Sequence, residues 1–167
     1  MNNIILIGMP SCGKSTIGVV LAKALGYGFL DSDLLIQERE NRLLCEIIED
    51  EGIDRFNQIE NEVNANINTT RTIIATGGSV IYGKEAMNHL KKLGKVVYIK
   101  LSYEQIQERL GNLESRGVSI RDGQSLEELY EERIPLYEKY ADITVVTEGL
   151  SIKDTVALIK EKLIQEK

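Results

Sequence analysis

The sequence predicts a three-layer α/β/α sandwich built on a five-stranded parallel sheet. Short apolar runs, mostly of β-branched residues, alternate along the 167-residue chain with longer segments of helical periodicity. Strands that are separated by helices pair in parallel through right-handed crossovers, and continuous apolar runs are typical of strands buried on both faces. No internal repeat and no linker rich in proline, glycine and serine interrupts this alternation. We therefore predict one domain over residues 1–167.

Five apolar runs are predicted as strands, the second being the weakest: 4–7, 28–30, 73–75, 96–99 and 143–146. Helical spacing is found at 14–25, 33–40, 43–50, 56–68, 84–93, 103–110, 126–140 and 152–164. The polar segment 111–124 has no clear periodicity. Because a segment this long without structure is more often a functional lid than a plain connector, we predict a lid there, with a disordered loop as the alternative.

Charge and cysteine content argue against several classes of protein. The chain carries 20 basic and 26 acidic side chains, whereas proteins that bind nucleic acid usually need a basic face. Its two cysteines, Cys12 and Cys45, form neither a disulfide framework nor a zinc-binding spacing. The N-terminal apolar run is too short for a signal peptide or a membrane span. We expect a cytoplasmic protein that binds neither nucleic acid nor membranes.

The segment after the first predicted strand fits the Walker A pattern, with Gly8, Gly13, Lys14 and Ser15 at its fixed positions. The glycines let successive backbone N–H groups point at phosphate oxygens, the lysine lies between the terminal phosphates, and the serine hydroxyl binds Mg²⁺. A chance glycine-rich turn is disfavoured, because the motif joins a predicted strand to a helix whose positive dipole end faces the same anion. We predict that a nucleoside triphosphate is bound by Gly8, Ser11, Cys12, Gly13, Lys14, Ser15 and Thr16.

Within this loop, Cys12 has two interpretations. Its thiol could be activated by Lys14 and by the helix N-terminus. The simpler interpretation is a small side chain that fills space.

Two carboxylates, Asp31 and Asp33, follow the second predicted strand. In a parallel sheet, the carboxyl ends of adjacent strands meet at one crevice where ligands bind. One carboxylate there could hold Mg²⁺ through a water molecule, and the other could hold a substrate hydroxyl or accept its proton. The alternative is a turn and a helix N-cap, which Asp and Ser also favour.

Taken together, these segments resemble the shikimate kinases, a branch of the P-loop kinases related to nucleoside-monophosphate kinases. The resemblance covers nearly the whole chain and rests on the order and spacing of its signals. After the P-loop, these signals are Asp31-Ser32-Asp33, Thr76-Gly77-Gly78-Ser79, Arg109 and Arg116 beside the predicted lid, and Glu132-Arg133-Ile134-Pro135-Leu136-Tyr137. The resemblance implies a nucleoside-monophosphate-kinase-like strand order of 2-3-1-4-5 and a substrate-binding helical region over residues 33–70.

The resemblance also implies an activity, the transfer of a phosphoryl group from ATP to a hydroxyl of shikimate by a monomer that uses Mg²⁺. Ser15 and Asp31 would serve Mg²⁺, Arg116 would move from the lid onto the phosphates, and Arg109 would lie along the adenine. Lys14, Asp33 and Arg116 are the implied catalytic residues. Such a set suits phosphoryl transfer, which needs positioning and charge neutralisation more than covalent chemistry.

On the acceptor side, the resemblance implies that Asp33 holds the reacting hydroxyl. Gly77 and Gly78 would offer backbone N–H groups to the substrate. Arg133 would bind the carboxylate of the substrate, with Asn57 beside it at a position that contacts the substrate in the family.

This acceptor site departs from the family pattern in the helix that follows Gly52. Shikimate kinases typically have Gly-Glu-x-x-Phe-Arg-x-x-Glu here, and this chain has Asn57 at the arginine position. An amide does not replace the charge of a guanidinium that pairs with a carboxylate. Ser79 also replaces the third glycine of the substrate turn, and Gly117 follows the lid arginine where the family usually has proline.

Three interpretations therefore stay open. The acceptor could be shikimate with Arg55 binding its carboxylate, although residues i and i+2 do not share a helix face. It could instead be another small hydroxylated molecule with less negative charge or a different shape. A non-catalytic module that binds ATP is the third interpretation, and the presence of Lys14, Asp33 and Arg133 argues against it.

Overall fold

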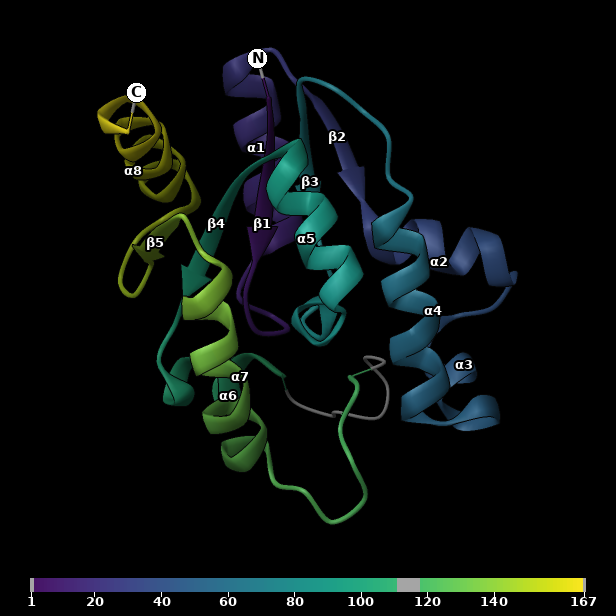
Figure 1. The fold of residues 1–167 in the computed structure, drawn as a ribbon. Coiled ribbons are helices and arrows are strands. Elements are labelled where there is room, and N and C mark those ends of the chain that lie inside the picture. Colours follow the sequence, from purple (N-terminus) through teal and green to yellow (C-terminus); the bar gives the residue numbers. More distant parts are fainter. Residues whose placement is uncertain (1, 111–117, 167) are drawn as a thin grey trace.

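The computed structural model describes residues 2–110 and 118–166 and shows the predicted alternation of strands and helices (Figure 1). The elements follow one another as β1 (Asn3–Ile7), α1 (Lys14–Leu25), β2 (Gly28–Asp31), α2 (Ser32–Glu40), α3 (Leu44–Glu51), α4 (Ile53–Ala65), β3 (Thr72–Ala75), the 3₁₀ turn η1 (Val80–Tyr82), α5 (Lys84–Leu93), β4 (Gly94–Lys100), α6 (Tyr103–Leu110), α7 (Leu126–Tyr140), β5 (Ile143–Val146) and α8 (Ile152–Gln165). The largest shift from prediction is in α4, which begins directly after Gly52 because that glycine ends α3 with a φ of 82°.

The sheet has five parallel strands in the order β2-β3-β1-β4-β5, which confirms the order implied by the family resemblance. Its central strand, β1, pairs with β3 on one side and β4 on the other, and Ile5 lies opposite both Ile74 and Val96. Helices α1 and α8 pack together over one face, whereas α5 packs on β4 from the other face, beside α4 and near α7 (Figure 1). The three predicted layers are therefore present.

Complete burial of the strands is confirmed only at the centre of the sheet. Every residue of β1 and β3 is buried. At the edges, Phe29 of β2 is 37% exposed and Val146 of β5 is 56% exposed. An edge strand has a neighbour on one side only, so the prediction of strands buried on both faces is wrong for β2 and β5.

A second, smaller apolar cluster lies apart from the sheet, among α2, α3 and α4. It consists of Ile36, Ile47, Phe56 and Ile59, all buried, with Leu44, Ile48 and Val63 packed around it. These helices fall within residues 33–70, the region predicted to bind the substrate. The cluster gives this region a core of its own beside the main one.

The fold brings the carboxyl ends of β1, β2 and β3 to one edge of the sheet, as expected for parallel strands. The P-loop follows β1, Asp31 ends β2, and the turn beginning at Thr76 follows β3. Gly8, at the start of the P-loop, has a φ of 151°, and a Cβ there would lie 2.6 Å from the carbonyl oxygen of Ile99 on β4. Only glycine allows the loop to leave the sheet at this point.

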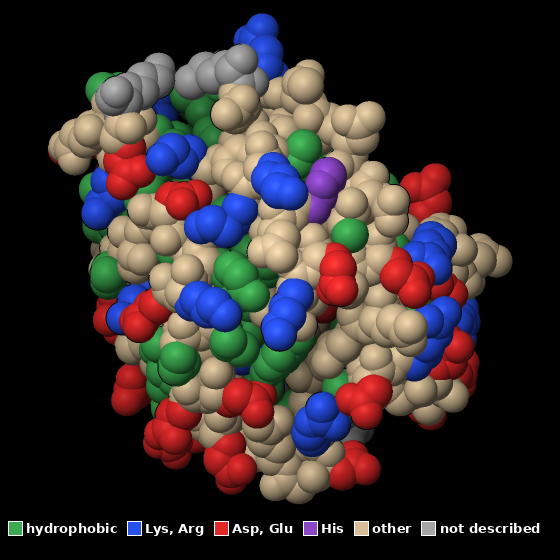
Figure 2. Space-filling model, in the orientation of Figure 1, with side chains coloured by type: hydrophobic (Ala, Val, Ile, Leu, Met, Phe, Trp, Pro, Cys, Tyr) green, Lys and Arg blue, Asp and Glu red, His purple; other side chains and the backbone are tan. Residues whose placement is uncertain are grey.

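No helix within residues 2–110 and 118–166 combines the length and the apolar character needed to cross a membrane. On the face of the molecule that Figure 2 shows, acidic and basic side chains are interspersed, and no continuous basic stripe is seen.

The pairing of β1 with β4 leads to a first prediction. Gly94, the first residue of β4, pairs with Asn3, and a Cβ at Gly94 would lie 1.9 Å from the backbone oxygen of Asn3. We expect Gly94→Ala to lower the free energy of unfolding in urea by about 1–3 kcal/mol, because the backbone of the central strands must shift.

The matched control is Gly28→Ala at the first residue of β2, where the nearest atom to a Cβ is the Thr72 hydroxyl oxygen at 3.2 Å. That side chain can move, so the control should change the free energy by no more than about 0.5 kcal/mol. Equal losses for the two variants would contradict the importance of this close approach.

Candidate active site

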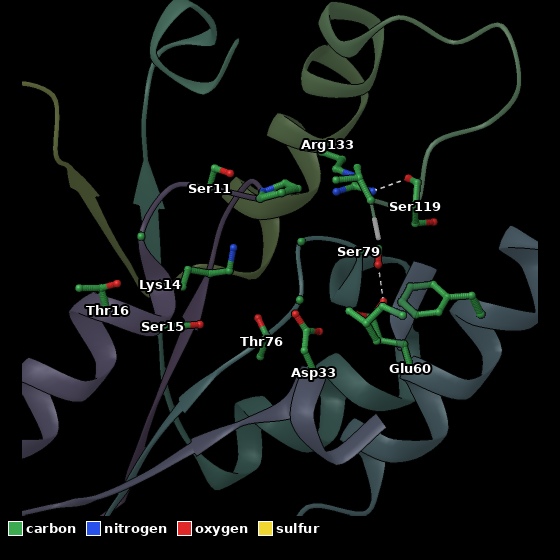
Figure 3. A pocket seen from close by; sticks show the side chains of 17 residues that line it. Ser11, Lys14, Ser15, Thr16, Asp33, Glu60, Thr76, Ser79, Ser119 and Arg133 are labelled. Carbon is green, nitrogen blue, oxygen red and sulfur yellow. Dashed lines mark hydrogen bonds between the residues drawn. The ribbon is translucent and has the colours of Figure 1, made fainter. Parts of the chain in front are cut away.

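A cavity of ≈ 390 Å³ opens where the three strand ends meet (Figure 3). The P-loop and the start of α1 line one side, and α2, α3, α4, the turn after β3, the segment that enters α7 and α7 itself line the other. Its lining residues are Pro10, Ser11, Gly13, Lys14, Ser15, Thr16, Asp33, Leu44, Phe56, Glu60, Thr76, Gly77, Gly78, Ser79, Val118, Ser119 and Arg133. One cavity therefore holds most of the predicted donor and acceptor residues.

On the donor side, Lys14 is 7% exposed and lies across the P-loop. Its Nζ donates hydrogen bonds to the carbonyl oxygens of Gly8 at 2.7 Å and Met9 at 2.9 Å, and lies 3.7 Å from the Sγ of Cys12. Cys12 is buried behind the loop and does not line the cavity, which agrees with the space-filling interpretation. Arg109, at the end of α6, donates from Nη1 to the Ser11 carbonyl oxygen at 3.4 Å, so it lies beside the loop.

The structure shows Asp31 as the N-cap of α2, and its role in holding Mg²⁺ stays a prediction. Its Oδ1 accepts the Asp33 backbone N–H at 3.0 Å and so caps α2, while its Oδ2 accepts a hydrogen bond from the Ser15 hydroxyl at 2.8 Å. A hydroxyl and a carboxylate at this spacing are oxygen ligands of the kind that Mg²⁺ prefers. Within residues 2–110 and 118–166, no cluster of three or more His, Cys, Asp or Glu side chains is arranged to hold a metal ion. A metal at Ser15 and Asp31 would therefore need further ligands from the phosphates or water.

Asp33 lies in the cavity at the start of α2. Its Oδ1 is buried and has no hydrogen-bond partner among the described residues. Burial, with the charge of Asp31, raises the pKa of Asp33 to about 6, against the opposing effect of Lys14. A carboxyl group with a pKa in this range can accept a proton near neutral pH.

Glu60, on α4, is an acceptor-side residue whose role could not be predicted from the sequence. It is 1% exposed, and its Oε1 accepts a hydrogen bond from the Ser79 hydroxyl. Its Oε2 has no partner among the residues that the structure describes. Burial and the charge of Asp33 raise the pKa of Glu60 to about 7. A glutamate next to Ile59 and four residues after Phe56, both core residues of α4, was the signal available in the sequence.

Gly77 explains how two carboxyl groups fit under the turn after β3. A Cβ at this position would lie 2.5 Å from the Oε2 of Glu60 and 2.7 Å from the Oδ1 of Asp33. Any side chain would collide with both oxygens. The structure thus supports a close packing role for this glycine, besides the predicted use of its N–H.

Arg133, on α7, is fully buried and faces the same turn from the other side. Its Nη2 donates to the Ser119 carbonyl oxygen at 2.7 Å, and a Cβ at Gly78 would lie 2.9 Å from its Nη1. One turn further along the helix, the Tyr137 hydroxyl donates to the Gly78 carbonyl oxygen, and the Tyr137 ring stacks on Tyr98 at 5.1 Å. The turn is therefore fastened to α7 next to the guanidinium.

Asn57 is not among the residues that line the cavity. Its Oδ1 accepts a hydrogen bond from the Ser119 hydroxyl at 3.1 Å. Arg55 is not among the lining residues, and its Nη1 lies 3.8 Å from Glu62 on the outer side of α4. The structure thus gives no support to Arg55 as a replacement for the missing arginine.

Part of the predicted lid, together with its Arg116, lies outside the described residues. The remaining residues, 118–124, are described, and two of them, Val118 and Ser119, line the cavity. The individual roles of the site residues stay predictions.

The five-stranded parallel sheet, the P-loop and a cavity that joins them to buried acceptor-side carboxyl groups define a P-loop kinase of the small-molecule class. The model of one family, described as shikimate kinase, matches residues 10–164. The chain belongs to the shikimate kinase family.

Individual relatives agree over their whole length. A shikimate kinase from Thermodesulfovibrio yellowstonii is 37% identical to this chain over 99% of the chain and 95% of its own length. A shikimate kinase from Francisella tularensis subsp. novicida is 39% identical over 98% of the chain and 96% of its own length. A solved shikimate kinase from Acinetobacter baumannii, in complex with shikimate, superposes with a TM-score of 0.92 at 30% identity, covering 100% of this chain and 95% of that one. The family and fold predictions are confirmed.

The raised pKa of Glu60 leads to a prediction about stability and pH. The pKa is 4.5 for an ordinary glutamate and about 7 here, so the folded state binds the proton more tightly. The stability that this gives is complete below pH 4.5 and is lost as the pH rises through about 7. Glutamine cannot ionise. We therefore expect the free energy of unfolding of Glu60→Gln, measured in urea at pH 8, to be about 1–3 kcal/mol higher than that of the unaltered chain.

The difference should shrink toward zero at pH 4.5. Glu62→Gln is the matched control on the same helix, because Glu62 is exposed and its hydrogen bond to Arg39 lowers its pKa. This variant should show no gain at pH 8. A gain for Glu60→Gln that is the same at every pH would show that ionisation is not its cause.

Proposed function

We propose that this protein transfers the γ-phosphoryl group of ATP to a hydroxyl group of shikimate. The observation that carries the proposal is that Lys14 of the P-loop, Asp33 and Arg133 all line one cavity. The related protein from Acinetobacter baumannii, which has nearly the same fold, is in complex with shikimate.

On the donor side, the P-loop backbone N–H groups and Lys14 bind the phosphates. Lys14 already points across the loop, held by the Gly8 and Met9 carbonyl oxygens, and would exchange these for phosphate oxygens. The N-terminus of α1 adds its positive dipole end. Mg²⁺ would be held by Ser15 and Asp31, whose oxygens lie 2.8 Å apart, and would supply positive charge to the phosphates.

On the acceptor side, Asp33 holds the reacting hydroxyl, and Arg133 pairs with the substrate carboxylate. The hydroxyl oxygen attacks the γ-phosphorus as the bond between that phosphorus and the bridging oxygen of ADP breaks. The hydroxyl proton passes to a carboxylate oxygen of Asp33, whose pKa of about 6 suits this acceptance. Lys14 offsets the charge that collects on the transferred group.

Asn57 favours a second candidate, a kinase of the same mechanism with another small hydroxylated acceptor. The cations that line the described part of the cavity are Lys14 and Arg133, so one guanidinium is available to an acceptor carboxylate. A less charged acceptor would lose less from the absent arginine. As the family resemblance implies, we expect a monomer that is active in the cytoplasm.

The first test is turnover with Asp33 altered. In a coupled assay of ADP release, we expect the unaltered protein to respond to shikimate, and Asp33→Asn to lower kcat by about 10²–10⁴-fold through loss of the proton acceptor. Asp50→Asn, at an exposed carboxylate paired with Arg42, is the control and should keep full activity. ADP release that depends on another polyol or hydroxy acid, and not on shikimate, would replace the proposed acceptor by the second candidate.

The second test restores the family arginine. We expect Asn57→Arg to lower the KM for shikimate by about 10–150-fold, since a charge-assisted hydrogen bond contributes about 1.5–3 kcal/mol. Arg55→Ala should leave the KM unchanged, because Arg55 faces Glu62. A KM that is unchanged or raised in Asn57→Arg, with folding intact by circular dichroism, would show that the acceptor is bound in another way.

A further inference from the structure

Glu60 is a buried carboxyl group that the mechanism above does not use. It lies beneath the turn Gly77–Ser79, where Ser79 donates a hydrogen bond to its Oε1 and its Oε2 packs against Gly77. Figure 3 shows Glu60 and Ser79 joined in this way, with Arg133 facing the same turn from α7. The side chain is thus placed between the residue that takes the proton and the residue predicted to bind the acceptor carboxylate.

The charged groups that face Glu60 come from three other elements. They are Asp33 on α2, Lys14 on α1 and Arg133 on α7, of which the first opposes ionisation of Glu60 and the other two favour it. Several other carboxylates on the elements packed against α4 are engaged elsewhere. Glu85 of α5 pairs with Asn61, Glu46 of α3 accepts the Leu43 N–H, and Glu40 and Glu51 pair with Arg42. Asn57, one turn earlier on the same helix, is uncharged and bonded to Ser119.

The protonation state of Glu60 therefore decides how much positive charge the acceptor meets. With Glu60 neutral, the polar neighbours of Arg133 among the described residues are Tyr82, Tyr137 and the Ser119 carbonyl oxygen, none of which is a carboxylate. With Glu60 ionised, a second negative charge beside Asp33 offsets Arg133 and repels an anionic acceptor, inside a site where charges are poorly screened. An arginine at position 57 would supply a further cation, and this chain lacks it.

We propose that Glu60, held by Ser79 beneath the Gly77–Gly78 turn, determines acceptor specificity by leaving the charge of Arg133 to an anionic acceptor when neutral and competing with that acceptor when ionised. The inference rests on the proposed function, because it takes the acceptor to be a carboxylate such as shikimate. Glu60 is a positioning residue in this account, since it acts through Arg133.

The experiment is calorimetric binding of shikimate to the full chain at pH 6 and pH 8. Because the pKa of Glu60 is about 7, the Kd of the unaltered protein should rise about 10-fold between these values as the neutral form is depleted. Binding at pH 8 should also take up close to one proton, measured by repeating the titration in buffers of different ionisation enthalpy. E60Q should bind about 10-fold more tightly than the unaltered protein at pH 8 and equally at pH 6, with this proton uptake lost.

Two further variants separate this role from a purely structural one. S79A removes the hydrogen bond that lowers the pKa of Glu60, so this pKa should rise in the variant. The loss of shikimate affinity should then begin at a higher pH than in the unaltered protein. A loosened site would instead bind weakly at both pH values. E62Q, at an exposed carboxylate of the same helix, should keep the pH dependence and proton uptake of the unaltered protein.

The outcomes distinguish this inference from the proposed function. If E60Q binds shikimate with the same pH dependence and proton uptake as the unaltered protein, the proposed role of Glu60 is wrong. The proposed acceptor is then unaffected. Absence of shikimate binding in the unaltered protein and E60Q at both pH values overturns the proposed acceptor, and this inference with it.

Discussion

The parallel pairing of β1 between β3 and β4 is the constraint on which the rest of the structure depends. Three successive strand ends must open at one edge of the sheet, and each carries a different chemical group: the P-loop after β1, the aspartates after β2 and the glycine turn after β3. The pairing requires a very close approach of backbones at Asn3 and Gly94. The phosphate-binding loop thereby shares one cavity with acceptor-site residues that range from Asp33 to Arg133 in the sequence.

Features governed by local pattern could be predicted from the sequence. The strands, most helix boundaries, the P-loop and the convergence of Asp31 and Asp33 with it follow from periodicity, glycine spacing and parallel pairing. The strand order followed from resemblance. Each of these depends on a short stretch of chain or on a general rule of topology, so one sequence is enough to state it.

The acceptor site was harder to predict because its arrangement depends on contacts between distant segments. Glu60 could be read as the end of a helical motif, and nothing local shows that it meets Ser79 or lies beneath Gly77. The hydrogen bond between Asn57 and Ser119 joins positions 62 residues apart. The exposure of β2 and β5 likewise depends on which strands occupy the edges, which an apolar run alone does not reveal.

The separate core of α2, α3 and α4 has a consequence for how such a protein can diverge. Ile36, Ile47, Phe56 and Ile59 pack among themselves, so these helices can exchange the residues on their cavity side without repacking the sheet that holds the P-loop. Selection acting on a chain of this kind can therefore alter the acceptor while the donor machinery is inherited intact. Asn57, at a position where shikimate kinases typically have arginine, belongs to one of these helices, α4.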